Sequence, residues 1–230
     1  MTTCEMLSLQ KILETLSAQR ALEIGTYMGG SLQVLSRFCR HVDSIDIDPC
    51  IPAKLGHLFS NVTFHIGNSA ELLPSVLQSD AQDCDPVGFV LIDGDHSTDG
   101  VRRDINALLS VPPSCEMVVL MHDAFNPDCR TGILSANWQI CPYVHEVEID
   151  YIPGVYHQQA YDTAADRSMW GGFACALLKP EPRQGDLVIS QRQQGLFEAV
   201  LLQSSHAPQR RTLLQRAKSR ARTLFSSLSR

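Results

Sequence analysis

A group of ionisable side chains follows the apolar segment PVGFVLI in the middle of the chain. It consists of Asp93, Asp95 and His96, with Asp99 close behind. A buried strand gives no packing reason for such a group at its end. Ligand sites of parallel α/β sheets lie beyond the carboxyl ends of the strands. We therefore assign Asp93 and His96 to a functional site, and we expect Asp99 to cap the helix that follows.

A second apolar segment, VVLM, ends in His122 and Asp123. If its strand neighbours the one before Asp93, two carboxylates and a histidine meet at one edge of the sheet. Such a set can hold a divalent cation, with water and substrate oxygens completing the coordination. The ordinary pKa of a histidine lies near neutrality, so His96 could act as a general base. The alternative is a hydrogen-bonded polar floor that holds no metal.

Glycines are concentrated in the segment EIGTYMGGS, residues 23–31, where an apolar strand would pass into a helix. Without side chains at Gly25 and Gly29, backbone can approach a ligand at the start of that helix. A dinucleotide fingerprint would need glycine where Tyr27 stands, so this is a different turn. A tight turn that binds nothing is the alternative interpretation.

The next two expected strands end in further candidate binding groups. Asp46 follows the glycine turn by about twenty residues, where a carboxylate can accept hydrogen bonds from ribose hydroxyls. Asn68 and Ser69 stand where an adenine edge could be recognised, although capping of a helix explains Ser69 equally well.

The elements that must position these groups form one α/β pattern. The candidate strands are apolar on both faces and recur with βα spacing, which predicts a parallel sheet covered by helices on both sides. Two later candidates, PYVHEVEIDYI and GGFACALL, are separated by a polar loop and predict an antiparallel hairpin at the sheet edge.

Composition divides the chain in two. Residues 1–180 carry ten Lys and Arg against 22 Asp and Glu, whereas residues 181–230 carry nine against three. We expect a catalytic domain over 1–180 and a basic helical appendage over 181–230, with an amphipathic helix near 209–226. That helix could lie on an anionic membrane surface, or dock on the acidic body of its own or a second chain.

Several classes of protein are disfavoured. The acidic body argues against general affinity for nucleic acid. No apolar run approaches the ~18 residues of a membrane span, and the first residues lack the features of a signal peptide. The eight cysteines show no CxxC pair, which favours a reducing compartment over a disulfide or zinc scaffold. We expect a cytoplasmic protein, whose tail could contact the inner face of the membrane.

The segments EIGTYMGGS, SIDIDP, GNS, LIDGDHS and LMHDA together resemble the class I S-adenosylmethionine-dependent O-methyltransferases. The similarity extends over about residues 20–178. It is greatest to small bacterial enzymes related to catechol and macrocin-type sugar O-methyltransferases. The resemblance implies a doubly wound, Rossmann-like sheet of seven mostly parallel strands with the last strand antiparallel.

The resemblance also implies roles for individual residues. Asp46 would hold the ribose, Asn68 and Ser69 the adenine, and His96 would act as base. His122 departs from the carboxylate that relatives usually offer, which disfavours magnesium and leaves manganese or no metal. Three further sets are implied. The methionine part of the cofactor would be surrounded by Glu23, Gly25, Tyr27, Gly29 and Ser31. Thr26 and Asp93 would also bind the cofactor, and the metal ligands would be Asp93, His122 and Asp123.

We therefore expect methyl transfer from S-adenosylmethionine to a hydroxyl of a small sugar-like or phenol-like acceptor, assisted by Mg²⁺ or Mn²⁺ if a metal is used. The short segment before the glycine turn leaves the cover of the acceptor to residues 124–170 or to a second subunit. Two alternatives are a metal-dependent hydrolase and a non-catalytic cofactor-binding or partner-binding module. The candidate ribose site at Asp46 disfavours the hydrolase, and the ionisable cluster disfavours the module.

Overall fold

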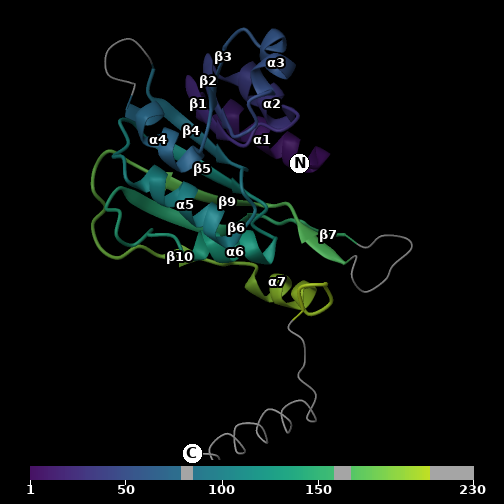
Figure 1. Ribbon diagram of the computed structural model, residues 1–230. Helices are drawn as coiled ribbons and strands as arrows, with labels where there is room; N and C mark the ends of the chain where they lie inside the picture. The colour runs from purple at the N-terminus through teal and green to yellow at the C-terminus, as the bar shows by residue number, and fades with distance from the viewer. Residues whose placement is uncertain (79–84, 158–166, 208–230) are drawn as a thin grey trace, which may run out of the picture.

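The computed structural model describes residues 1–78, 85–157 and 167–207, which form a sheet covered by helices on both faces (Figure 1). The strand order is β10-β6-β9-β5-β4-β1-β2-β3, in which β9 is antiparallel to β5 and β6 and the other pairs are parallel. The strands are β1 (Arg20–Ile24), β2 (His41–Asp46), β3 (Val62–Ile66), β4 (Val87–Ile92), β5 (Met117–His122), β6 (Val144–Ile152), β9 (Phe173–Leu178) and β10 (Ile189–Ser190).

The sheet has eight strands, so the predicted number of seven is wrong. The additional strand is β10, which pairs in parallel with β6 through Ile189 and Val147. It satisfies backbone groups along an edge of β6 that would otherwise stay unpaired. The mostly parallel α/β class and the antiparallel strand GGFACALL are confirmed, as is its pairing with the strand from PYVHEVEIDYI.

Helices cover both faces because the central strands alternate apolar side chains between two cores. In β4, Phe89 and Leu91 pack with α1 and α2, whereas Val90 and Ile92 pack with α4, α5 and α6. Each such fully buried side chain stabilises the fold by ~1.5–3 kcal/mol. The helices are α1 (Thr3–Leu16), α2 (Gly30–Phe38), α3 (Ile51–Leu55), the 3₁₀ helix η1 (Gly56–Leu58), α4 (Ser69–Gln78), α5 (Thr98–Leu109), α6 (Pro127–Leu134) and α7 (Gln194–Leu201).

The cap of α5 differs from our expectation. Ser97 is the N-cap and its side chain accepts a hydrogen bond from the Gly100 backbone nitrogen. Asp99 lies in the first turn of the helix and pairs with Arg102 at 2.7 Å. An acid in the first turn still complements the positive end of the helix dipole, so the residue type suits either position.

Part of the segment beyond residue 180 packs on the body. Buried Arg130 pairs with Asp150 at 2.7 Å, lies over the ring of Phe197 in α7 at 4.3 Å from its centroid, and donates a hydrogen bond to Gln194. The division at residue 180 stays a prediction, and the basic helix expected near 209–226 lies outside the described residues. Among the described helices, none is long and apolar enough to cross a membrane.

Candidate functional site

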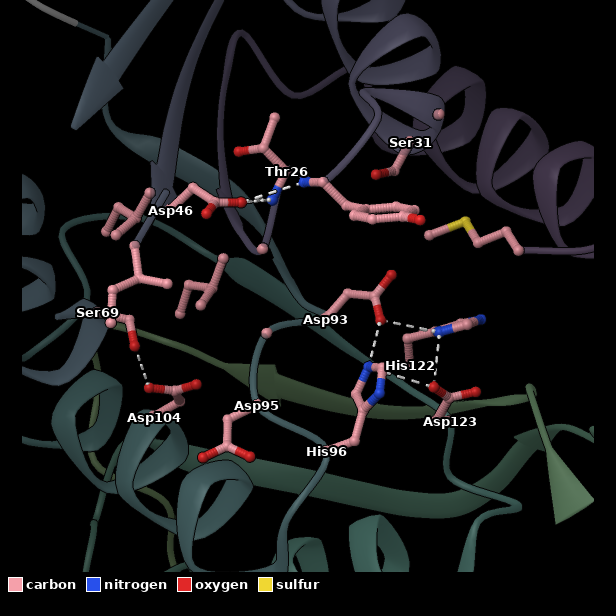
Figure 2. A pocket seen from close by; sticks show the side chains of 18 of the residues that line it. Thr26, Ser31, Asp46, Ser69, Asp93, Asp95, His96, Asp104, His122 and Asp123 are labelled. Carbon is pink, nitrogen blue, oxygen red and sulfur yellow. Dashed lines mark hydrogen bonds and ion pairs between the residues drawn. The ribbon is translucent and has the colours of Figure 1, made fainter. Parts of the chain in front are cut away.

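A cavity of about 1120 Å³ opens at the carboxyl ends of β1, β2, β4 and β5 (Figure 2). Its size exceeds that of a pocket for one small ligand, so it has room for two reactants. Most of the residues predicted from the sequence line it, namely Gly25, Thr26, Tyr27, Ser31, Asp46, Asn68, Ser69, Asp93, His96, His122 and Asp123. Glu23 and Gly29 are not among the lining residues.

The glycine turn brings the ends of β1 and β4 into close contact. Gly25 has φ +89°, and a Cβ atom there would lie 2.1 Å from the Asp93 carbonyl oxygen, so no larger residue fits. Tyr27 adopts the left-handed conformation with φ 46° and is 82% exposed at the mouth of the cavity. Gly29 is the left-handed N-cap of α2 and packs on Leu55, so its part in the site is indirect.

Glu23 lies behind the cavity wall and is fully buried. It accepts hydrogen bonds from the hydroxyls of Ser31 and Ser44. Burial raises the pKa of Glu23 to about 7, although both serine hydrogen bonds act in the opposite direction. Ser31 reaches the cavity, so Glu23 orients a group that can touch a ligand and does not touch it itself.

Asp46 holds the glycine turn against β2. One carboxylate oxygen accepts hydrogen bonds from the backbone nitrogens of Thr26 and Tyr27, at 2.8 and 3.1 Å. The other accepts a hydrogen bond from the backbone nitrogen of Asp48 at 2.8 Å. A carboxylate offers about four lone-pair positions. About one therefore remains for a ligand hydroxyl.

Asn68 and Ser69 begin α4. The Asn68 side chain accepts a hydrogen bond from the Ala70 backbone nitrogen at 3.0 Å, which leaves the Ser69 hydroxyl free of a capping role. Ser69 donates instead to Asp104 of α5 at 2.5 Å. Asp104 lines the cavity and was not among the predicted residues.

The ionisable groups of β4 and β5 form one polar cluster. His122 Nδ1 lies 3.0 Å from Asp93 Oδ1 and 3.5 Å from Asp123 Oδ2. His96 Nε2 lies 3.4 Å from each of these two oxygens. Figure 2 shows the four side chains converging beneath the glycine turn. Parallel neighbouring strands thus bring together the groups that the sequence separates.

Glu5 of α1 joins this cluster from the opposite side. Its Oε1 lies 3.5 Å from His122 Nε2 and accepts a hydrogen bond from the Gly172 backbone nitrogen at 2.6 Å. Its other oxygen accepts from the Thr2 backbone nitrogen. In the sequence, Glu5 stands in the pattern Thr2-x-x-Glu5 of a capping box, which predicts a helix start and no site role.

Three carboxylates surround His122. Burial alone would lower the pKa of His122, but Asp123, Asp93 and Glu5 raise it to about 11. For two of the carboxyls the contacts outweigh burial. Hydrogen bonds with His122 and with backbone nitrogens lower the pKa of Glu5 to about 2, and hydrogen bonds with His122 and His96 lower the pKa of Asp93 below its usual range. The hydrogen bond between His96 and Asp93 raises the pKa of His96. The three carboxylates therefore favour the protonated form of the His122 imidazole.

The donor atoms of Asp93, His122 and Asp123 also fit a divalent cation, since they lie within 4.8 Å of one another. Separations near 3 Å match neighbouring ligands of an octahedral ion with ~2.1 Å bonds. One imidazole with two carboxylates suits manganese better than magnesium. A metal would have to displace the proton on His122.

The other walls of the cavity are partly apolar. Trp170 and Val155 line it from the ribbon formed by β7 (Val155–His157) and β8 (Ser168–Trp170). The Trp170 ring meets the edge of His96 at a centroid distance of 5.7 Å. Met1 and Met6 line it from the N-terminal segment, which we had not expected to contribute. Residues 158–166, part of the expected cover, lie outside the described residues.

Comparison with known proteins gives one family match. Residues 22–124 match the family described as a methyltransferase domain. That range contains the glycine turn, Asp46 and the cluster around Asp93. No curated protein matches the sequence significantly.

Three similar solved structures share the fold, each at 18% identity. TomG, an O-methyltransferase from Streptomyces achromogenes in complex with SAM, has a TM-score of 0.55 over 78% of this chain and 81% of its own. An O-methyltransferase from Bacillus cereus in complex with SAH has a TM-score of 0.56, with 78% of this chain and 82% of the other chain covered. Cofactor-bound Rv0187 from MTB has a TM-score of 0.55, with 79% of this chain and 82% of the other chain covered.

Proposed function

We propose that this chain, whose residues 22–124 match the family described as a methyltransferase domain, transfers a methyl group from S-adenosylmethionine to a hydroxyl of a small sugar-like or phenol-like acceptor. One observation carries the proposal. A single cavity joins the glycine turn and Asp46 to a cluster of acid and base groups at the ends of β4 and β5. The structures of TomG with SAM and of the Bacillus cereus enzyme with SAH support this cofactor.

The binding groups divide along the cavity. In the proposal, Gly25, Ser31 and the backbone of the glycine turn receive the methionine part. Asp46 accepts a hydrogen bond from a ribose hydroxyl through its remaining lone pair, and Asn68 and Ser69 contact the adenine. The acceptor then lies between Asp93, His96 and Trp170, at the opposite end.

The chemistry that the protein must add is small. Bound S-adenosylmethionine supplies an electrophilic methyl group, which the acceptor oxygen takes while the neutral thioether leaves. The cavity walls align the acceptor with that methyl group, and His96 accepts the hydroxyl proton. The hydrogen bond with Asp93 makes His96 a stronger base and stabilises its protonated form. A divalent cation held by Asp93, His122 and Asp123 would lower the pKa of the acceptor hydroxyl.

The cofactor assignment is tested by binding. We expect S-adenosylmethionine and S-adenosylhomocysteine to bind the intact protein at micromolar strength in titration calorimetry. Asp46→Ala should weaken both by ~1–3 kcal/mol, through loss of a ribose contact and of the anchor on the glycine turn. Asp99→Asn, an exposed acid outside the cavity, is the matched control. Equal affinity of the wild type and Asp46→Ala would remove Asp46 from the site.

The metal assignment has a separate test. We expect Mn²⁺ to bind at one site in calorimetry, and Asp123→Asn to weaken it by ~10-fold or more, since even indirect partners of a metal contribute that much. Binding should release a proton, because the ligand His122 must be neutral. The absence of Mn²⁺ binding, together with full methyl transfer after exhaustive chelation, would leave a polar floor without metal.

A further inference from the structure

Buried Asp104 and half-buried Ser69 form a hydrogen-bonded pair at the end of the cavity away from His96, His122 and Asp123 (Figure 2). Asp104 lies on α5 and is only 4% exposed. Among the described residues, the Ser69 hydroxyl is the one group that donates a hydrogen bond to the Asp104 carboxylate. The adjacent cation, Arg103, pairs with Asp95 at 3.6 Å instead. Burial raises the pKa of the Asp104 carboxyl, as expected for a carboxylate with too few donors.

The second oxygen of Asp104 lies against the floor of the cavity. A Cβ atom built on Gly94 would meet Ile24 at 3.1 Å and Asp104 Oδ2 at 3.5 Å. Gly94, Gly67 and Ala70 line the same end and leave it free of large side chains. A flat ring can therefore approach both Ser69 and Asp104.

Hydrogen-bond direction determines what this pair can recognise. A serine hydroxyl has one proton and two lone pairs. Because Ser69 gives its proton to Asp104 Oδ1, it can only accept from a ligand, and Asp104 Oδ2 likewise accepts. Two acceptors side by side match the two protons of an amino group on a ring. A carbonyl oxygen at the same position would face them with further lone pairs and leave all of them unpaired.

We propose that Ser69 and Asp104 together select a purine with an exocyclic 6-amino group, adenine, over one with a 6-oxo group. The inference rests on the proposed function, because it assumes that the adenosyl end of the cofactor occupies this end of the cavity. Asp104 is then a specificity-determining residue of the cofactor site, acting both directly and by fixing the direction of the Ser69 hydroxyl.

The experiment compares S-adenosylhomocysteine with its deaminated analogue, S-inosylhomocysteine, by calorimetry on the full chain. We expect the wild type to prefer the amino form by ~100-fold, since a site built for a donor rejects an analogue that lacks it. Asp104→Asn should reduce the preference to ~3-fold or less, because the amide nitrogen supplies a donor for the 6-oxo group. Ser69→Ala should reduce it ~10-fold, and Asp99→Asn should keep the wild-type ratio.

The ratio of the two affinities is measured within one variant, so it does not depend on the stability of that variant, which thermal melting records separately. Equal binding of both ligands to the wild type would overturn the inference while leaving the methyltransferase assignment in place. The inference is also overturned if Asp104→Asn and Ser69→Ala both keep the wild-type preference. If the wild type binds neither ligand, the proposed function fails, and this inference fails with it.

Discussion

His96→Ala should lower the rate of methyl transfer by ~10²–10⁴-fold while cofactor affinity stays within about twofold of the wild type. That magnitude is typical of the loss of a general base. His96 lies 3.4 Å from two carboxylate oxygens and contacts Trp170 on the acceptor side, so its imidazole faces the space where a hydroxyl would react. Asp46 and Ser69, the expected cofactor contacts, lie elsewhere in the cavity.

The measurement uses radiolabelled S-adenosylmethionine with a panel of sugars and phenols, followed by kinetics on the acceptor that reacts. Added imidazole should restore part of the activity of His96→Ala, because it can enter the space left by the side chain and take the proton. His57→Ala, at an exposed histidine of η1, is the control and should be fully active. Normal turnover by His96→Ala would reduce His96 to a structural residue.

The arrangement of the polar cluster could be predicted because it follows from local rules. The segments before Asp93 and His122 are continuous apolar runs, which identifies them as buried parallel strands. Side chains at the ends of neighbouring parallel strands must meet. In the structure, His122 Nδ1 lies 3.0 Å from Asp93 Oδ1. The glycine turn follows the same logic, since the contact of Gly25 with Asp93 requires a residue without a side chain.

Glu5 could not be predicted in this way. Its position depends on how α1 docks over β5 and the Gly171–Gly172 turn, and no sequence pattern encodes that docking angle. The capping box explains the glutamate completely at the local level, so nothing in the segment requires a second role. The same holds for β10, because two residues are too few to show a strand period.

Asp104 is an intermediate case, because a signal was present. In α5 the buried side chains beyond Gly100 are those of Val101, Asp104, Ile105 and Leu108, which follow three- and four-residue steps. A carboxylate within such an apolar stripe must have a partner, since burying an unpaired charge is costly. The helical pattern therefore marks Asp104 as unusual, but only the structure identifies Ser69 as the partner and the cavity as the place it faces.

The largest expected effect on stability concerns Glu23. Burial raises the pKa of Glu23 to about 7 in the folded protein, against 4.5 for a free glutamate. Between these two pH values the folded state binds a proton that the unfolded state has lost, so the free energy of unfolding falls as pH rises. The loss over this range is about 3 kcal/mol, is complete somewhat above pH 7, and is absent below about pH 4.

Glu23→Gln should remove this pH dependence, because an amide does not titrate. Its oxygen can accept from one serine and its nitrogen can donate to the other, so the contacts with Ser31 and Ser44 survive the exchange. Urea unfolding at intervals from pH 4.5 to 8 gives the difference in stability between variant and wild type. We expect that difference to move by about 3 kcal/mol in favour of Glu23→Gln as pH rises, whereas the exposed control Glu181→Gln should give no such change. Parallel curves for Glu23→Gln and the wild type would mean that Glu23 is ionised in the folded protein throughout this range, and that donors to its carboxylate outweigh its burial.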